Sequence, residues 1–130
     1  FKVDRRNWMS HFFAYLNRMR LIKRWGLMRN LREENVQEHG LQVAVIAHGL
    51  ALIEKRIFGC EVSPEHVMAL AAFHEVGEVF TGDLPTPIKY FNPTIKKAYD
   101  EIEDFAKEKL IAMLPELLQK DYREKKFWWA

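Results

Sequence analysis

The sequence has little of several features that would indicate other classes of protein. It contains one cysteine, Cys60, so an internal disulfide is excluded and the cytoplasm is the expected compartment. Its apolar runs are short and broken by histidine or charge, which argues against a transmembrane helix and a membrane partner. Its net charge is only +2, from 20 basic and 18 acidic residues, which does not favour a nucleic-acid polymer as partner.

Strand-like alternation of apolar and polar residues is also missing, and the apolar periodicity is helical along most of the chain. The spacing predicts helices over residues 10–22, 35–57, 63–79, 92–114 and, after Pro115, to about 127. Together with the length of 130 residues, this predicts one all-α domain, a bundle of five or six helices.

Cap signals support the predicted helix starts. Asn35 with Glu38 resembles a capping box, and the pairs Ser63-Pro64 and Asn92-Pro93 place a capping side chain before a first-turn proline. The segment TGDLPTP, residues 81–87, is predicted to be non-helical because its glycine and two prolines interrupt a helix.

The stretch FHEVGEVFTGDLPTP, residues 73–87, concentrates charge in apolar surroundings, with His74, Glu75, Glu78 and Asp83 close together. Buried charge is costly unless it is paired, hydrogen-bonded or bound to a metal. On one continuous helix, His74 and Glu78 would share a face and Glu75 would neighbour Glu78. Histidine and carboxylates are ligands for zinc, manganese, iron or cobalt, and a carboxylate that binds no metal could act as an acid or base.

Other interpretations compete with a metal site. The metalloprotease motif HExxH is disfavoured, because HEVGE has Glu78 where the second histidine belongs. Charges around one core histidine at a helix end would give the same spacing, and spacing alone does not separate the two interpretations. His39, taken alone, is more typical of a cap-region or partly buried histidine than of a ligand.

Three motifs carry a resemblance to a known family. RWGLMRN, ENVQEHGLQVAVIAHGLA and LAAFHEVGEVFTGDLPTPIKYF resemble the HD-domain metal-dependent phosphohydrolases, and most closely the bacterial 5'-deoxynucleotidases. The resemblance covers about Met9 to Leu117. It implies an HD-domain helical bundle that hydrolyses deoxyribonucleoside 5'-monophosphates to deoxynucleoside and phosphate. It also implies a divalent metal (cobalt, manganese, magnesium or zinc) and a homodimer.

The resemblance also implies roles for seven residues. Its metal ligands are His39, His74 and Glu75, and its catalytic carboxylate is Glu78. Its substrate residues are Arg24, Trp25 and Asp83. Arginine suits a phosphate, an indole ring can stack on any base, and a carboxylate can accept a hydrogen bond from a sugar hydroxyl.

Two departures from the family pattern affect the metal site. Glu75 stands where the family has aspartate, and the family's last ligand, an aspartate on a later helix, has no match here. A domain over residues 1–130 would therefore lack the family's C-terminal helices. Two alternatives follow: a catalytically impaired, nucleotide-binding relative, or a protein-interaction module that uses a basic first helix and the aromatic tail, residues 125–130.

Overall fold

A computed structural model describes residues 10–123 of the chain. In this range the chain is helical without strands, which confirms the predicted all-α class. The elements are α1 (Phe12–Leu16), the 3-10 helix η2 (Asn17–Leu21), α2 (Val36–Arg56), α3 (Pro64–Phe73), α4 (Glu78–Thr81), α5 (Thr86–Lys89), α6 (Pro93–Ala112) and α7 (Glu116–Arg123). None of the described helices is long and apolar enough to cross a bilayer.

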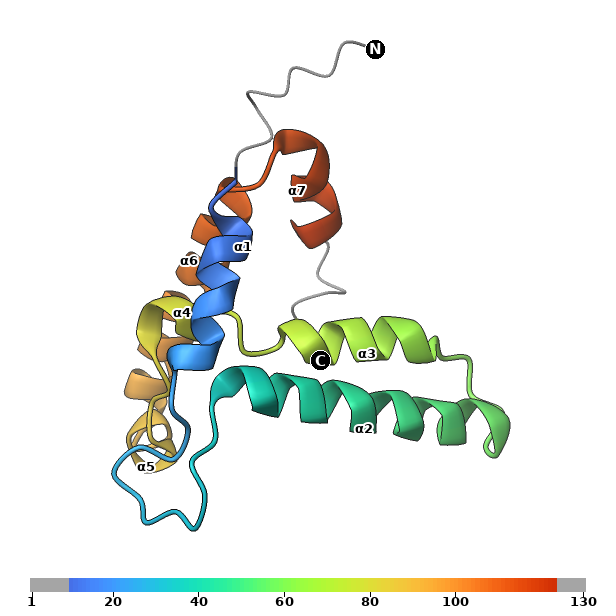
Figure 1. Cartoon of the computed structure of the whole chain (residues 1–130), viewed down its shortest axis with the longest axis horizontal. Coiled ribbons are helices and arrows are strands. Elements are labelled where there is room, and N and C mark those ends of the chain that lie inside the picture. Colours follow the sequence, from blue (N-terminus) through green and yellow to red (C-terminus); the bar gives the residue numbers. More distant parts are fainter. Residues whose placement is uncertain (1–9, 124–130) are drawn as a thin grey trace.

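Helices α2 and α3 form an antiparallel pair that extends away from the other helices (Figure 1). The predicted caps set both starts: the Asn35 side chain accepts a hydrogen bond from the Glu38 amide, and Ser63 accepts one from the His66 amide. Small residues allow the two helices to approach closely. A β-carbon at Gly40 would lie 3.7 Å from the Ala72 carbonyl oxygen, so the pairing brings the start of α2 beside the end of α3.

The main apolar core lies among α1, η2, α4, α6 and α7. Its buried members include Phe12, Met19, Val79 and Leu110. The Phe12 ring meets the Tyr122 ring of α7 edge-on, with centroids 5.0 Å apart. This core anchors the turn between α3 and α4, because Val76 of that turn is fully buried in the core.

Two predicted boundaries were wrong. The helix expected over residues 63–79 ends at Phe73, and a turn over residues 74–77 separates α3 from α4. At Gly77 this turn lies so close to α6 that an added β-carbon would be 3.7 Å from the Glu103 carbonyl oxygen. The segment 81–87 is not wholly non-helical either, because α5 begins at Thr86 with Pro87 in its first turn, where proline is tolerated. The aromatic tail lies outside the described residues.

Candidate functional site

Three potential metal ligands meet where the α2–α3 pair joins the rest of the molecule. His39 lies near the start of α2, and His74 and Glu75 directly follow α3. One ligand atom from each lies within 4.8 Å of the others, and the two imidazole centroids are 5.4 Å apart. Two imidazoles and a carboxylate are a suitable donor set for a divalent transition metal, so these residues fit such an ion. The structure thus brings together the three ligands that the resemblance named.

The His74 ring is oriented by contacts on both nitrogens. Its Nδ1 lies 2.5 Å from the Ala71 carbonyl oxygen, and its Nε2 lies 3.1 Å from Glu75 Oε1. A carbonyl oxygen can only accept, so Nδ1 carries the proton in that bond. Nε2 is therefore the atom that faces Glu75 and is available to a metal.

Neighbouring charges and burial shift the pKa values of the three potential ligands in different directions. The hydrogen bond with His74 holds the pKa of Glu75 well below its usual range, and the same bond raises the pKa of His74. Burial, followed by the positive charges of Arg24 and His74, lowers the pKa of His39. A neutral His39 and an ionised Glu75 are the forms that bind a cation.

Glu78 is the buried acid of the site. Its side chain is among the described polar groups that are buried, and its Oε2 atom has no hydrogen-bond partner there. Burial, a hydrogen bond with Glu75 and the negative charges of Glu75 and Asp83 raise its pKa far above the ordinary value. The raised pKa favours the protonated form of Glu78, which is the form that a general acid needs.

The expected substrate residues lie on two neighbouring loops. The Trp25 amide donates a 3.1 Å hydrogen bond to Asp83 Oδ2, which joins the loop before α2 to the loop after α4. The guanidinium of Arg24 lies 5.2 Å from the Trp25 ring centroid. Trp25 has a φ of 60°, an uncommon conformation for a large residue, and its ring is about half exposed. The structure therefore places a cation, an open aromatic face and a carboxylate within one surface region.

A cavity of about 830 Å³ opens beside the potential metal ligand His74, between the α2–α3 pair and α6. Its wall includes His74, apolar side chains of α2 and α3 such as Val43 and Leu70, and Lys89 from α5. Lys89 Nζ lies 3.3 Å from a Glu103 oxygen. Arg24, Trp25 and Asp83 do not line this cavity, so the two features are separate parts of the region.

Sequence interpretation missed Glu34 and Lys89. Glu34 lies 2.9 Å from Arg24 and 3.8 Å from His39, and the charge of Lys89 acts on Glu78. Glu34 belongs to the charged run REEN, in which nothing distinguishes it from Glu33. The available signal was its position immediately before the Asn35 cap of the helix that carries His39.

Comparison with known proteins gives a consistent result. The family described as 5'-deoxynucleotidase YfbR-like matches residues 11–126. A 5'-deoxynucleotidase of Photorhabdus laumondii is 57% identical over 115 residues, which cover 88% of this chain and 58% of that protein. A 5'-deoxynucleotidase of Cronobacter sakazakii is 60% identical over 110 residues, which cover 85% and 55%.

A solved HD-domain phosphohydrolase of Listeria innocua has a similar fold. It superposes with a TM-score of 0.76 at 28% identity and covers 87% of this chain and 54% of its own. The chain therefore spans less than two thirds of the length of the proteins that it matches.

Proposed function

The chain belongs to the YfbR-like 5'-deoxynucleotidase family, and from this premise we propose that it hydrolyses deoxyribonucleoside 5'-monophosphates to deoxynucleosides and inorganic phosphate. The observation that carries the proposal is the meeting of His39, His74 and Glu75 beside a buried Glu78 whose pKa is raised. Phosphomonoester hydrolysis needs a site for charge neutralisation and a proton for the leaving oxygen, and this arrangement offers both.

In this proposal, His39, His74 and Glu75 hold a divalent metal. The donor set is compatible with zinc, cobalt or manganese, and a hard ion such as magnesium would rely more on the carboxylate. A bound divalent ion supplies Lewis-acid polarisation of a phosphoryl oxygen and lowers the pKa of water. Glu75, in the position of the family's aspartate, supports this role because its Oε1 already faces the His74 nitrogen.

Glu78 is the proposed catalytic residue. Its carboxyl group keeps a proton because it is buried beside Glu75. Protonated Glu78 can give that proton to the 5'-oxygen of the departing deoxynucleoside. The carboxylate that results can then accept a proton from the attacking water, so the residue returns to its starting form.

Arg24, Trp25 and Asp83 are the proposed substrate residues. The guanidinium keeps donors free for a phosphate, because the contact with Glu34 involves Nη1. The exposed face of Trp25 suits any base, which favours a broad base preference. Asp83 uses Oδ2 for the Trp25 amide, and its other oxygen can accept a hydrogen bond from a sugar hydroxyl.

We also propose a cytoplasmic homodimer. One unpaired cysteine suits a reducing compartment. Exposed aliphatic side chains on one side of α2, among them Leu41, Val45 and Leu52, favour contact with a second copy.

The test is phosphate release by this chain from a deoxynucleoside 5'-monophosphate, with cobalt, manganese or magnesium added. The matching ribonucleotide is the control for selectivity at the sugar. We expect release that requires metal and is faster with the deoxy substrate. Nucleotide binding without release under all three metals would instead favour the impaired, binding-only relative.

A further inference from the structure

Glu34 lies between the residue proposed to bind phosphate and a proposed metal ligand. Its Oε2 accepts a 2.9 Å hydrogen bond from Arg24 Nη1, and its Oε1 lies 3.8 Å from His39 Nδ1. The three side chains are about equally sheltered, with exposed fractions of 21%, 20% and 24% for Arg24, His39 and Glu34. One carboxylate thus contacts both functional groups, each through a different oxygen.

The backbone explains why residues 24 and 34 meet. Lys23 and Asn35 form an antiparallel bridge, the Arg24 amide donates 2.9 Å to the Glu34 carbonyl, and the Val36 amide donates 2.9 Å to the Ile22 carbonyl. Residues opposite each other in such a pairing direct their side chains to the same side. The loop over residues 24–34 is therefore closed at its base, and the Arg24–Glu34 contact lies at that base.

The positive charge of Arg24 disfavours the binding of a cation at the proposed metal site. Arg24 and His39 contact the two oxygens of one carboxylate, so the positive charge of Arg24 lies close to the proposed ligand His39. A fixed positive charge that disfavours imidazolium also disfavours a bound divalent cation, and the effect is stronger in a partly buried site. Glu34 lies 2.9 Å from Arg24 and 3.8 Å from His39 Nδ1, so its negative charge offsets that of Arg24 at this ligand.

We propose that Glu34 is a positioning residue, which holds Arg24 for the phosphate and offsets the Arg24 charge so that a cation can bind at His39 and His74. The inference rests on the proposed function for the roles of these partners. Glu34 is not one of the clustered ligand residues, so it acts through Arg24 and His39 rather than on the reacting atoms. Carboxylates that contact metal-binding histidines commonly tune affinity in this way.

The neighbouring residue offers a matched control. Glu33 is also a carboxylate with a basic partner in the same loop, 2.7 Å from Lys23, but its side chain is 77% exposed. An exposed ion pair of this kind contributes little to the free energy of folding. Glu33→Gln therefore makes the same chemical change one residue away without touching the proposed centre.

The test is the manganese affinity of the full chain, measured by calorimetry without nucleotide. We expect Glu34→Gln to weaken binding by about tenfold or more, and Glu33→Gln to leave it unchanged. The double variant Arg24→Met with Glu34→Gln removes both charges and should recover most of the affinity. In phosphate-release assays, Glu34→Gln should raise KM more than it lowers kcat.

Equal affinities for Glu34→Gln and Glu33→Gln would overturn the inference while leaving the metal site intact. A loss that the double variant does not relieve would indicate damage to the loop instead, and would also overturn it. The metal measurement needs no turnover. A chain that shows the expected affinity pattern but releases no phosphate would therefore support the role of Glu34 and contradict the proposed activity.

Discussion

The two ends of the α2–α3 pair differ in the kind of side chain that they carry. The near end is the one that joins the rest of the molecule, and the far end is the one at the connection between the two helices. At the near end, His39, His74 and Glu75 are partly buried and contact other charged groups. At the far end, aliphatic and aromatic side chains such as Leu50, Ile57 and Phe58 are 58%, 71% and 67% exposed. Half-buried charge is costly unless it is used or neutralised, so the near end has the features of a site.

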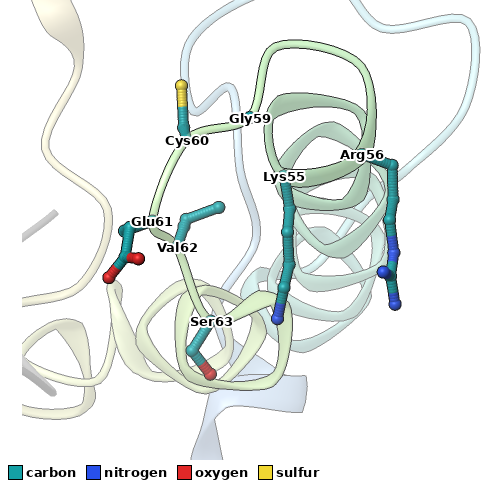
Figure 2. Close-up of a pocket in the computed structure, with 7 residues that line it drawn as sticks. All are labelled: Lys55, Arg56, Gly59, Cys60, Glu61, Val62 and Ser63. Atoms are coloured by element: carbon teal, nitrogen blue, oxygen red, sulfur yellow. The ribbon is translucent and has the colours of Figure 1, made fainter.

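The far end also has a hollow of about 570 Å³, but it lacks convergent chemistry. It is lined by the last turn of α2, with Lys55 and Arg56, and by residues of the α2–α3 connection such as Cys60 (Figure 2). A hydrogen bond with Glu54 raises the pKa of the Cys60 thiol, which disfavours a reactive thiolate. A hollow alone therefore does not indicate function in this protein.

The largest effect on the near end is expected from Glu78→Ala. Loss of the proposed acid should reduce phosphate release by about 100-fold or more, while metal affinity stays close to that of the unchanged chain. Glu101→Ala, at an exposed carboxylate of α6, is the control. Loss of metal together with activity would show that Glu78 is a ligand instead.

His39→Ala should come next, because it removes a proposed ligand. Manganese binding should weaken by about 100-fold, because losing a ligand costs at least as much affinity as losing a residue that only contacts a ligand. The rise in Tm that metal produces should also disappear. His11→Ala is the control, since His11 is exposed at the start of α1. Retained affinity in His39→Ala would remove His39 from the site.

Acidification should weaken metal binding at the near end. The hydrogen bond with Glu75 raises the pKa of His74, so a proton competes with the metal at a higher pH than at an ordinary histidine. Below that pKa, affinity should fall about tenfold per pH unit for one displaced proton. For the metal-free fold the sign is opposite: the raised pKa stabilises it at low pH, and this contribution is lost as the pH rises through the pKa. Calorimetry across about pH 5.5 to 8 tests both, by metal titration for the affinity and by thermal unfolding for the metal-free fold. A metal affinity that does not change with pH would contradict the first prediction.

A smaller effect is expected from Glu75→Asp, which restores the family's residue. The shorter side chain should draw the carboxylate back from His74 Nε2, so that a metal ion fits between the two groups more easily. We expect metal content or activity to rise by about threefold, a change of less than 1 kcal/mol. An unchanged enzyme would show that glutamate already serves as the ligand.

The smallest effect is expected at the far end. Leu50→Ala removes an exposed side chain and should change the free energy of unfolding by less than about 0.5 kcal/mol, with no effect on metal affinity. The matched change Leu110→Ala, at a fully buried leucine, should destabilise the protein by about 2–5 kcal/mol. A metal effect from Leu50→Ala would show that the two ends of the pair are coupled.

The fold was predictable where local chemistry decides it. The side chains of Asn35, Ser63 and Asn92 begin helices as their cap signals predicted, because each satisfies amides that no residue within the helix can reach. The end of α3 was not predictable in this way. Residues 74–77 have helical periodicity in the sequence, and the turn depends on packing of Gly77 against α6 and of Val76 into the core.

The candidate site likewise has features that the sequence predicts and features that depend on the tertiary structure. The sequence by itself determined which residue types are present, where α2 and α3 begin, and, through its resemblance to a family, which seven residues to examine. Only the tertiary structure decided that His39 lies beside His74, that Glu78 is buried beside Glu75, and that Glu34 rather than Glu33 contacts Arg24 and His39. Caps and periodicity act over a few residues, whereas burial and charge pairing depend on distances between segments that are far apart in the chain.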